Sequence, residues 1–187
     1  MSIRITSGVF KGRRIKSVES SELRPTTEKV RAAIFSILGH DQMNNAKVLD
    51  LFAGTGALGI EALSLGASLA HFVESDRRRA SMIQQTLEEL SVSNKSRVIR
   101  GRVENVLGTL DKPYGFVLIG APYDLKSWDL LLSEIDQELL LDSEGYLVVE
   151  YRYGTALRER YGRLVEQSKR KYGDTGLSVY RVSDEND

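Results

Sequence analysis

The 187-residue sequence predicts one α/β domain built on a parallel sheet, preceded by a small β-hairpin. Two observations support the domain: strand-like apolar runs alternate with helix-like segments from residue 47 to residue 150, and a glycine-rich turn follows the first run. A third, a pair of strand-like runs near the end of the chain, predicts that the sheet finishes in a hairpin. The composition, 41% hydrophobic and 28% charged, is that of a globular protein with a well-buried core.

The cysteine count and the hydropathy pattern exclude several classes of protein. No cysteine is present, so disulfides and thiolate chemistry are ruled out. Only His40 and His71 could offer imidazole ligands, and we expect no metal site. No run approaches the roughly 20 apolar residues of a membrane span, and no signal peptide opens the sequence. We therefore expect a cytoplasmic protein with no membrane partner.

The first expected elements are two short strands at residues 3–7 and 13–18, which flank a turn at residues 9–12. A helix follows, with Thr26 or Thr27 as its cap, an apolar stripe that ends at Leu38, and Gly39 as its stop. We expect a basic hairpin extension over residues 1–22 and the main domain over residues 23–187.

The overall formal charge of zero hides a basic first segment. Residues 1–36 carry eight basic and three acidic residues, a net charge of +5. The basic residues are Arg4, Lys11, Arg13, Arg14, Lys16, Arg24, Lys29 and Arg31. Such a patch favours contact with an anionic polymer. A solvated hairpin surface is an equally good interpretation of the charge alone.

From residue 47 the pattern alternates between strand and helix, which indicates a parallel sheet with helices on both faces. The expected strands span residues 47–52, 69–74, 97–101, 114–119 and 145–150, and the expected helices span residues 57–65, 76–91, 103–110 and 127–140. The closing hairpin joins strands at 164–172 and 177–182. In open α/β sheets a ligand lies beyond the carboxyl ends of the strands, and this places Asp50, Gly54, Glu74, Arg102 and Gly120 around one crevice.

The glycine-rich turn lies between the first core strand and the helix after it. Gly54 and Gly56 allow positive φ and let backbone N–H groups approach a ligand closely. The helix that follows directs the positive end of its dipole to the same place. The pattern of Gly54, Gly56 and Gly59 also matches the dinucleotide-binding fingerprint. A structural turn with no ligand is the remaining alternative.

Two strand-end acids decide which ligand this loop suits. Asp50 precedes the first glycine by four residues, where its carboxylate would repel a pyrophosphate and would suit a cationic amino group. S-adenosylmethionine carries such a group and no phosphate. Glu74 ends the next strand twenty residues after Gly54, the spacing of an acid that holds ribose hydroxyls. Three arginines, Arg77 to Arg79, open the following helix, and we expect most of them to face solvent.

Four motifs resemble the RsmD family, bacterial 16S rRNA (guanine-N2)-methyltransferases that use S-adenosylmethionine. The motifs are Ile5-x-Ser7-Gly8-x-x-Lys11-Gly12-Arg13-Arg14, Leu23-Arg24-Pro25-Thr26-Thr27-x-x-Val30-Arg31, Leu49-Asp50-Leu51-Phe52-Ala53-Gly54-Thr55-Gly56-Ala57-Leu58-Gly59 and Tyr172-Gly173-Asp174-Thr175. The resemblance implies a class I methyltransferase fold, Rossmann-like, with a seven-stranded sheet whose last strand is antiparallel. It also implies a monomer that acts on 16S rRNA or on a small-subunit assembly intermediate, and an N-terminal hairpin that contacts the RNA.

The resemblance assigns three groups of residues. Those expected to hold the cofactor are Asp50, Phe52, Gly54, Gly56, Glu74 and Val103. Those expected to contact RNA are Arg4, Lys11, Arg13, Arg14, Arg24 and Arg31. The expected catalytic loop is Gly120, Ala121, Pro122 and Tyr123, at the position of the family's Asp/Asn-Pro-Pro-Tyr/Phe.

Two positions depart from the family pattern. Gly120 has no side chain to accept a hydrogen bond from the guanine amine, which leaves the carbonyls of Gly120 or Ala121, with Asp124 as a possible substitute. Losing one polar contact in a transition state costs about 10²- to 10³-fold in rate, so we expect a slow enzyme. The alternatives are a catalytically degenerate protein that binds RNA and cofactor, and a small-molecule methyltransferase.

The second departure is Arg102, where an acceptor for the adenine amine is usual. An arginine side chain only donates hydrogen bonds. The backbone N–H of Val103 and the carboxylate of Glu104 are then expected to contact the adenine instead.

Overall fold

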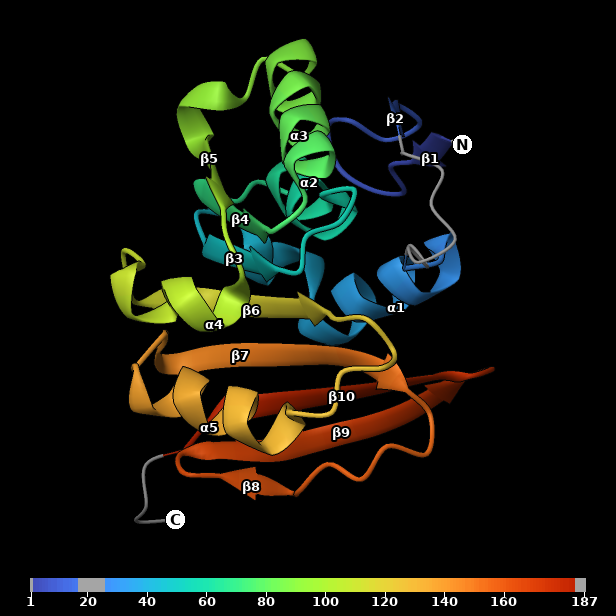
Figure 1. The fold of residues 1–187 in the computed structure, drawn as a ribbon. Helices are drawn as coiled ribbons and strands as arrows, with labels where there is room; N and C mark the ends of the chain where they lie inside the picture. Colours follow the sequence, from blue (N-terminus) through green and yellow to red (C-terminus); the bar gives the residue numbers. More distant parts are fainter. Residues whose placement is uncertain (1, 17–25, 184–187) are drawn as a thin grey trace.

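The structure, a computed structural model, describes residues 2–16 and 26–183. Its centre is an eight-stranded mixed sheet with the order β5-β4-β3-β6-β7-β10-β9-β8 (Figure 1). The strands are β3 (Lys47–Leu51), β4 (Leu69–Glu74), β5 (Ser96–Arg100), β6 (Tyr114–Gly120), β7 (Leu141–Arg152), β8 (Arg160–Tyr161), β9 (Leu164–Tyr172) and β10 (Thr175–Val182). Strands β3 to β7 pair in parallel, and β10 lies antiparallel between β7 and β9.

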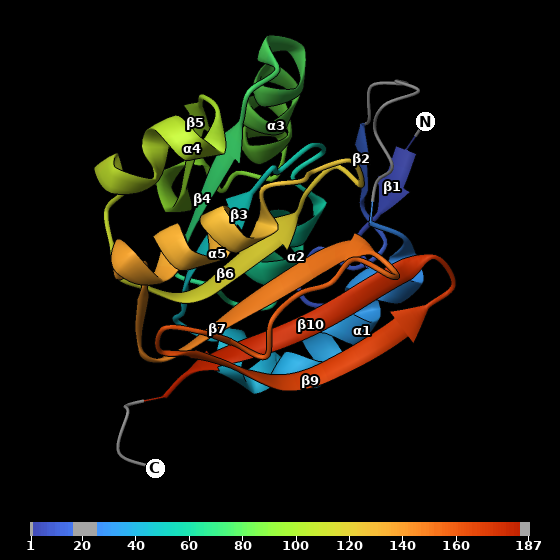
Figure 2. The ribbon, with the colours of Figure 1, turned by 60° about the horizontal axis from the view of Figure 1, so that its bottom comes forward.

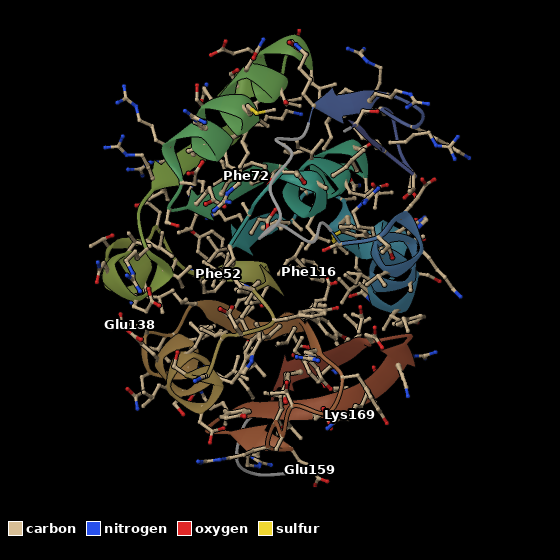
Figure 3. The ribbon with its side chains drawn as sticks, turned by 45° about the vertical axis from the view of Figure 1, so that its right-hand side comes forward. Phe52, Phe72, Phe116, Glu138, Glu159 and Lys169 are labelled. Carbon is tan, nitrogen blue, oxygen red and sulfur yellow. The ribbon has the colours of Figure 1, made fainter. Side chains whose placement is uncertain are left out.

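The helices cover both faces of this sheet, as the alternating pattern predicted (Figure 2). The α-helices are α1 (Glu28–Leu38), α2 (Ala57–Ser64), α3 (Arg77–Glu89), α4 (Val103–Val106) and α5 (Trp128–Gln137), and short 3₁₀ turns span His40–Met43, Ser93–Lys95 and Leu107–Thr109. One buried cluster joins the sheet to α1, α2 and α3, and the other joins it to α4 and α5. Phe116 belongs to the first and Phe52 packs against the second, and both are labelled in Figure 3.

Two features of the sheet differ from the prediction. The resemblance implied seven strands, and the eighth is the two-residue strand β8, which is too short to produce a periodic pattern. It pairs with the start of β9, where Tyr161 is buried opposite Leu164. The final turn is also tighter than expected, because β10 already begins at Thr175.

The first hairpin packs directly on α2. Its strands are β1 (Ser2–Arg4) and β2 (Arg14–Lys16), and the expected residues 17 and 18 lie outside the described part. Glu61 of α2 accepts hydrogen bonds from the backbone N–H groups of Thr6 and Ser7 at 2.9 and 2.6 Å and from the Thr6 hydroxyl at 2.6 Å. A Cβ on Gly8 would lie 1.9 Å from the carbonyl oxygen of Ser64, so only glycine allows this approach.

The hairpin also contributes to the core of the main domain. Ile3, Ile5 and Ile15 belong to the same buried cluster as the apolar residues of α1 and α2. The boundary of the expected division into residues 1–22 and 23–187 lies outside the described residues, and the division stays a prediction. Among the described residues, no helix is long and apolar enough to span a membrane.

Candidate active site

A pocket of about 470 Å³ opens at the carboxyl ends of β3, β4, β5 and β6. This is the edge of the sheet at which a ligand was expected, and the volume falls within the usual range for small-molecule sites. The pocket is lined by Phe52, Val73, Glu74, Ser75, Arg79, Gly101, Arg102, Val103, Glu104, Gly120, Ala121, Pro122 and Tyr123. The structure thus brings Phe52, Glu74 and Val103 together with the loop at residues 120–123.

The glycine-rich loop between β3 and α2 has the backbone conformation that its residues predicted. Gly54 and Gly56 have positive φ angles of 58° and 74°. Phe52 also has a positive φ, 57°, which is a strained conformation for an aromatic residue. Because Phe52 lines the pocket, this strain lies at the candidate ligand site.

Glu74 connects this loop to the pocket wall. One carboxylate oxygen accepts a hydrogen bond from the backbone N–H of Gly54 at 2.8 Å. The other accepts one from the N–H of Asp76 at 2.8 Å and one from the guanidinium of Arg79 at 3.0 Å. Most of Arg77 to Arg79 were expected to face solvent; Arg79 is three-quarters buried and pairs with Glu74. Its position in the first turn of α3, five residues after Glu74, is the only sequence signal for this contact.

Asp50 lies behind the loop and is not part of the pocket lining. Its Oδ2 accepts a hydrogen bond from the N–H of Gly59 in α2 at 2.9 Å. Burial raises the pKa of Asp50 from 3.8 to about 8, against the lowering effect of this hydrogen bond. The carboxyl group therefore joins β3 to α2 from beneath the loop. Gly54 and Gly56 also lie outside the lining, and a direct contact of these three residues with a ligand stays a prediction.

The far wall of the pocket comes from the start of α4. Val103 is its first residue, and its side chain is buried. Amide groups in the first turn of a helix have no acceptor within that helix. Arg102 is three-quarters exposed, and its Nε lies 3.6 Å from Glu104 Oε2. At Arg102, where the family pattern has a hydrogen-bond acceptor, this chain therefore has an exposed ion pair at the pocket edge. The backbone N–H of Val103 lies next to it.

The loop at residues 120–123, which is expected to be catalytic, is tied to the closing hairpin of the sheet. The hydroxyl groups of Tyr123 and Thr175 lie 2.6 Å apart, and Thr175 is buried at the start of β10. Thr175 is the last residue of the fourth motif, to which the sequence assigned no role. The aromatic ring at position 123 is therefore held at both ends, by its backbone in the loop and by its hydroxyl in the hairpin.

A second polar pair lies beside Gly120. Glu150 on β7 is directly opposite Gly120 in the strand register and is largely buried. The hydroxyl of Thr26 donates a hydrogen bond to Glu150 Oε2. A Cβ on Gly120 would lie 3.6 Å from Thr26 Oγ1. From the sequence, Thr26 was expected only as one of two alternative caps of the helix. The cap of α1 is the other one, Thr27, whose hydroxyl accepts a hydrogen bond from the Val30 N–H at 3.3 Å.

Of the residues expected to contact RNA, the exposed ones lie on the hairpin. Lys11, Arg13 and Arg14 are exposed, and Arg14 donates to the hydroxyl of Ser2 at 3.0 Å. Arg4 is 58% exposed and pairs with Glu28 at 2.8 Å. Arg24 lies outside the described residues.

The prediction for Arg31 is wrong, because the side chain is 1% exposed and cannot reach a phosphate. Its guanidinium donates to the backbone carbonyls of Thr26 at 2.8 Å and Arg4 at 2.6 Å. Its Nε lies 3.5 Å from Glu61 Oε2 in a buried ion pair. Arg31 therefore joins α1, the hairpin and α2. Charge counted along the sequence does not distinguish such a residue from a surface arginine. No cluster of metal-ligating side chains occurs among residues 2–16 and 26–183.

The antiparallel β10 inserted after five parallel strands, with a pocket at the carboxyl ends of those strands, defines the class I methyltransferase fold. A family model described as "Conserved hypothetical protein 95" matches residues 3–181. The chain belongs to this family, the RsmD/YlbH family, as its motifs predicted.

Individual relatives extend over nearly the whole chain. The chain is 36% identical to "Putative rRNA methyltransferase YlbH" of Bacillus subtilis, over 96% of this chain and 98% of the relative. It is 36% identical to "Ribosomal RNA small subunit methyltransferase D" of Haemophilus influenzae, over 96% of this chain and 92% of the relative. Among solved structures, "Putative methyltransferase yhhF from Escherichia coli" superposes with a TM-score of 0.87 at 25% identity, over 98% of this chain and 99% of that one.

Proposed function

We propose that this protein transfers a methyl group from S-adenosylmethionine to the exocyclic N2 amine of a guanine in 16S rRNA, in the free RNA or in a small-subunit assembly intermediate. One observation carries the proposal. A single pocket joins the residues expected to hold the cofactor, Phe52, Glu74 and Val103, to the loop at residues 120–123 that is expected to receive the base. Methylation of rRNA with this cofactor is also the activity of the family to which the chain belongs.

The pocket suits a cationic nucleoside without phosphate. Phe52, Val73 and Val103 offer an apolar wall for a base, and Glu74 stands where ribose hydroxyls are expected. The two arginines in the lining, Arg79 and Arg102, are each paired with a glutamate, Glu74 and Glu104 respectively, which disfavours a phosphate there. When bound, S-adenosylmethionine supplies an activated methyl group on a sulfonium centre.

The residues of the chain then bind and orient the two reactants. The Glu74 carboxylate would accept hydrogen bonds from the ribose, and the Val103 N–H would donate to the adenine. The loop of Gly54 and Gly56, braced by Asp50, allows the close approach of the rest of the cofactor. Tyr123 stacks on a guanine that has left its helix, as aromatic side chains do in RNA recognition.

The exposed basic residues of the hairpin position the RNA. Arg4, Lys11, Arg13 and Arg14 contact phosphates, which fixes the orientation of the RNA without reading its sequence. The hairpin that carries these residues is bound to α2, the helix that follows the glycine-rich loop, so phosphate contacts there would orient the target base toward the pocket.

The direct test is transfer of labelled methyl groups from S-adenosylmethionine to small ribosomal subunits, and to protein-free 16S rRNA, from cells that lack this modification. We expect label on one guanine N2 in at least one substrate, and none in large subunits as the control. Label at another atom, or in large subunits, would contradict the proposed target.

The absence of a side chain at Gly120 favours one second candidate, a degenerate protein that binds RNA and cofactor without turnover. Calorimetric binding of S-adenosylmethionine with no label in any rRNA would support it. A small-molecule methyltransferase would bind cofactor but show no salt-dependent RNA affinity, because RNA binding through phosphates weakens by about 0.7–0.9 log units per contact per log unit of salt.

A further inference from the structure

We propose that the hydroxyl of Thr26, oriented by Glu150, accepts the N–H of the target amine at the place that a side chain at position 120 would otherwise serve. This inference rests on the proposed function, because it names the group that receives the hydrogen bond of the guanine amine. It assigns a role in methyl transfer to Thr26 and a positioning role to Glu150.

The strand register places both groups beside the catalytic loop. Gly120 is the last residue of β6, and Glu150 is its direct partner on β7. Thr26 comes from the segment just before α1, nearly 100 residues earlier in the chain, and its Oγ1 lies 3.6 Å from the point where a Cβ on residue 120 would stand. A Cβ on residue 120 would thus be in ordinary van der Waals contact with the hydroxyl, so the hydroxyl lies directly next to the position where a side chain on residue 120 would begin.

The hydrogen bond to Glu150 determines what the Thr26 hydroxyl can do. A hydroxyl has one proton and two lone pairs. The proton of Thr26 is directed to the Glu150 carboxylate, so the oxygen presents only lone pairs to a third group. A carboxylate partner also increases the electron density on that oxygen, since hydrogen bonds to charged groups are stronger than neutral ones. Thr26 is thereby a fixed acceptor.

A guanine amine needs such an acceptor because its nitrogen lone pair is delocalised into the ring. When one N–H of the amine donates to Thr26 Oγ1, the nitrogen gains electron density toward the methyl group. The nitrogen lone pair then forms the new N–C bond, and the electron pair of the breaking C–S bond stays on sulfur. The methylated nitrogen releases one proton to water, and the products are the N2-methylguanine, the demethylated cofactor and that proton.

The test compares Thr26→Val, Thr26→Ser and Glu150→Gln in the full chain. We measure single-turnover methyl transfer at saturating cofactor, together with the Kd for S-adenosylmethionine and the melting temperature. Thr26→Val should lose about 10²- to 10³-fold in rate, the usual cost of one preorganised contact, with an unchanged Kd. Thr26→Ser should restore transfer, and Glu150→Gln, which still offers an oxygen to Thr26, should lose less than Thr26→Val. The matched control is Thr27→Val, which removes the helix cap and should lower the melting temperature without lowering the rate.

A second measurement does not depend on turnover. Inosine lacks the 2-amino group, so an RNA fragment with inosine at the mapped target cannot make this hydrogen bond. The wild-type protein should bind the guanine fragment several-fold more tightly than the inosine fragment, and Thr26→Val should bind both equally.

The outcomes separate the two proposals. Equal rates for wild type and Thr26→Val, or unchanged discrimination against inosine, would overturn the role of Thr26 and leave the proposed function intact. Loss of transfer in Thr26→Ser at an unchanged melting temperature would overturn it as well. A wild-type protein that transfers no methyl group would refute the proposed function, and this inference with it.

Discussion

The hydroxyl of Tyr123 lies 2.6 Å from the hydroxyl of Thr175, so the loop after β6 is bound to the first residue of β10. The two residues come from segments that are far apart in the sequence, and Thr175 is buried. A ring held in this way loses little freedom when a base stacks on it. In the proposed function, the hydrogen bond would prepare the loop for the base before the RNA arrives.

Removing this hydrogen bond should lower the rate of methyl transfer without changing the affinity for S-adenosylmethionine. Tyr123→Phe keeps the ring and removes the hydroxyl, and Thr175→Val removes the partner. A double-mutant cycle on the single-turnover rate should give a coupling of about 0.5–1.5 kcal/mol, the net value of a hydrogen bond. Tyr123→Ala should cost more, about 1–3 kcal/mol in RNA binding, because it removes the stacking surface. Equal effects of Phe and Ala at position 123 would argue against stacking.

Glu61 should be essential for stability because it supports the hairpin from within the core. Its side chain is fully buried, accepts hydrogen bonds from Thr6 and Ser7, and pairs with the buried Arg31. Glu61→Ala leaves the Arg31 charge unpaired, and breaking such a pair costs about 3–5 kcal/mol. The free energy of unfolding in urea measures this loss. Glu28→Gln, which breaks the exposed pair with Arg4, serves as the control and should cost less than about 1 kcal/mol.

Asp50 should make the protein less stable as pH rises. Its pKa is about 8 in the folded state, whereas the ordinary value is 3.8. Between those values the folded protein binds one proton more than the unfolded chain, so the free energy of unfolding falls as pH increases across that window. Asp50→Asn removes this proton and keeps an oxygen for the Gly59 N–H. Denaturant titrations from pH 5 to pH 8 should show a decline in the wild type that is smaller in the variant; parallel curves would mean that Asp50 does not hold the extra proton.

The hairpin should supply salt-dependent RNA affinity. Lys11→Gln and Arg13→Gln each remove one exposed charge, and the removal of each phosphate interaction should reduce the slope of log K against log salt by about 0.7–0.9. Filter binding to 16S rRNA at several salt concentrations measures that slope. Arg97→Gln removes an exposed charge at the amino end of β5, away from the pocket, and should leave the slope unchanged. A similar decrease of the slope for all three variants would mean that the RNA responds to the overall charge of the protein and not to a defined site on the hairpin.

The sequence predicts those parts of the fold and the site that depend on neighbours along the chain. The strand ends and the glycine turn place Gly54 near Glu74, and the 2.8 Å hydrogen bond between them follows from the spacing of a βα unit. The fold class and the family follow from the same local motifs. Each of these features is fixed within one or two consecutive elements.

Contacts between distant segments could not be predicted from the sequence. The partnership of Tyr123 with Thr175 depends on the position of β10 next to β7, and that of Thr26 with Glu150 depends on how the chain enters α1. The error at Arg31 has the same origin, because its partner Glu61 lies on another helix. A local pattern reports the charge of a residue but not the element that will cover it.

The close contact between Gly8 and Ser64 has a consequence for the kind of RNA that the protein accepts. The N–H of Val9 also donates to the Ser64 carbonyl at 2.9 Å, so the hairpin is joined through its backbone to the helix that follows the glycine-rich loop. The basic residues next to the hairpin turn, Lys11 and Arg13, are thereby attached to the same helix as the glycine-rich loop. In the proposed function, an RNA contacts both the hairpin and the pocket only if its own folding presents a phosphate to the one and an unstacked guanine to the other, which makes the tertiary shape of the RNA part of the selection.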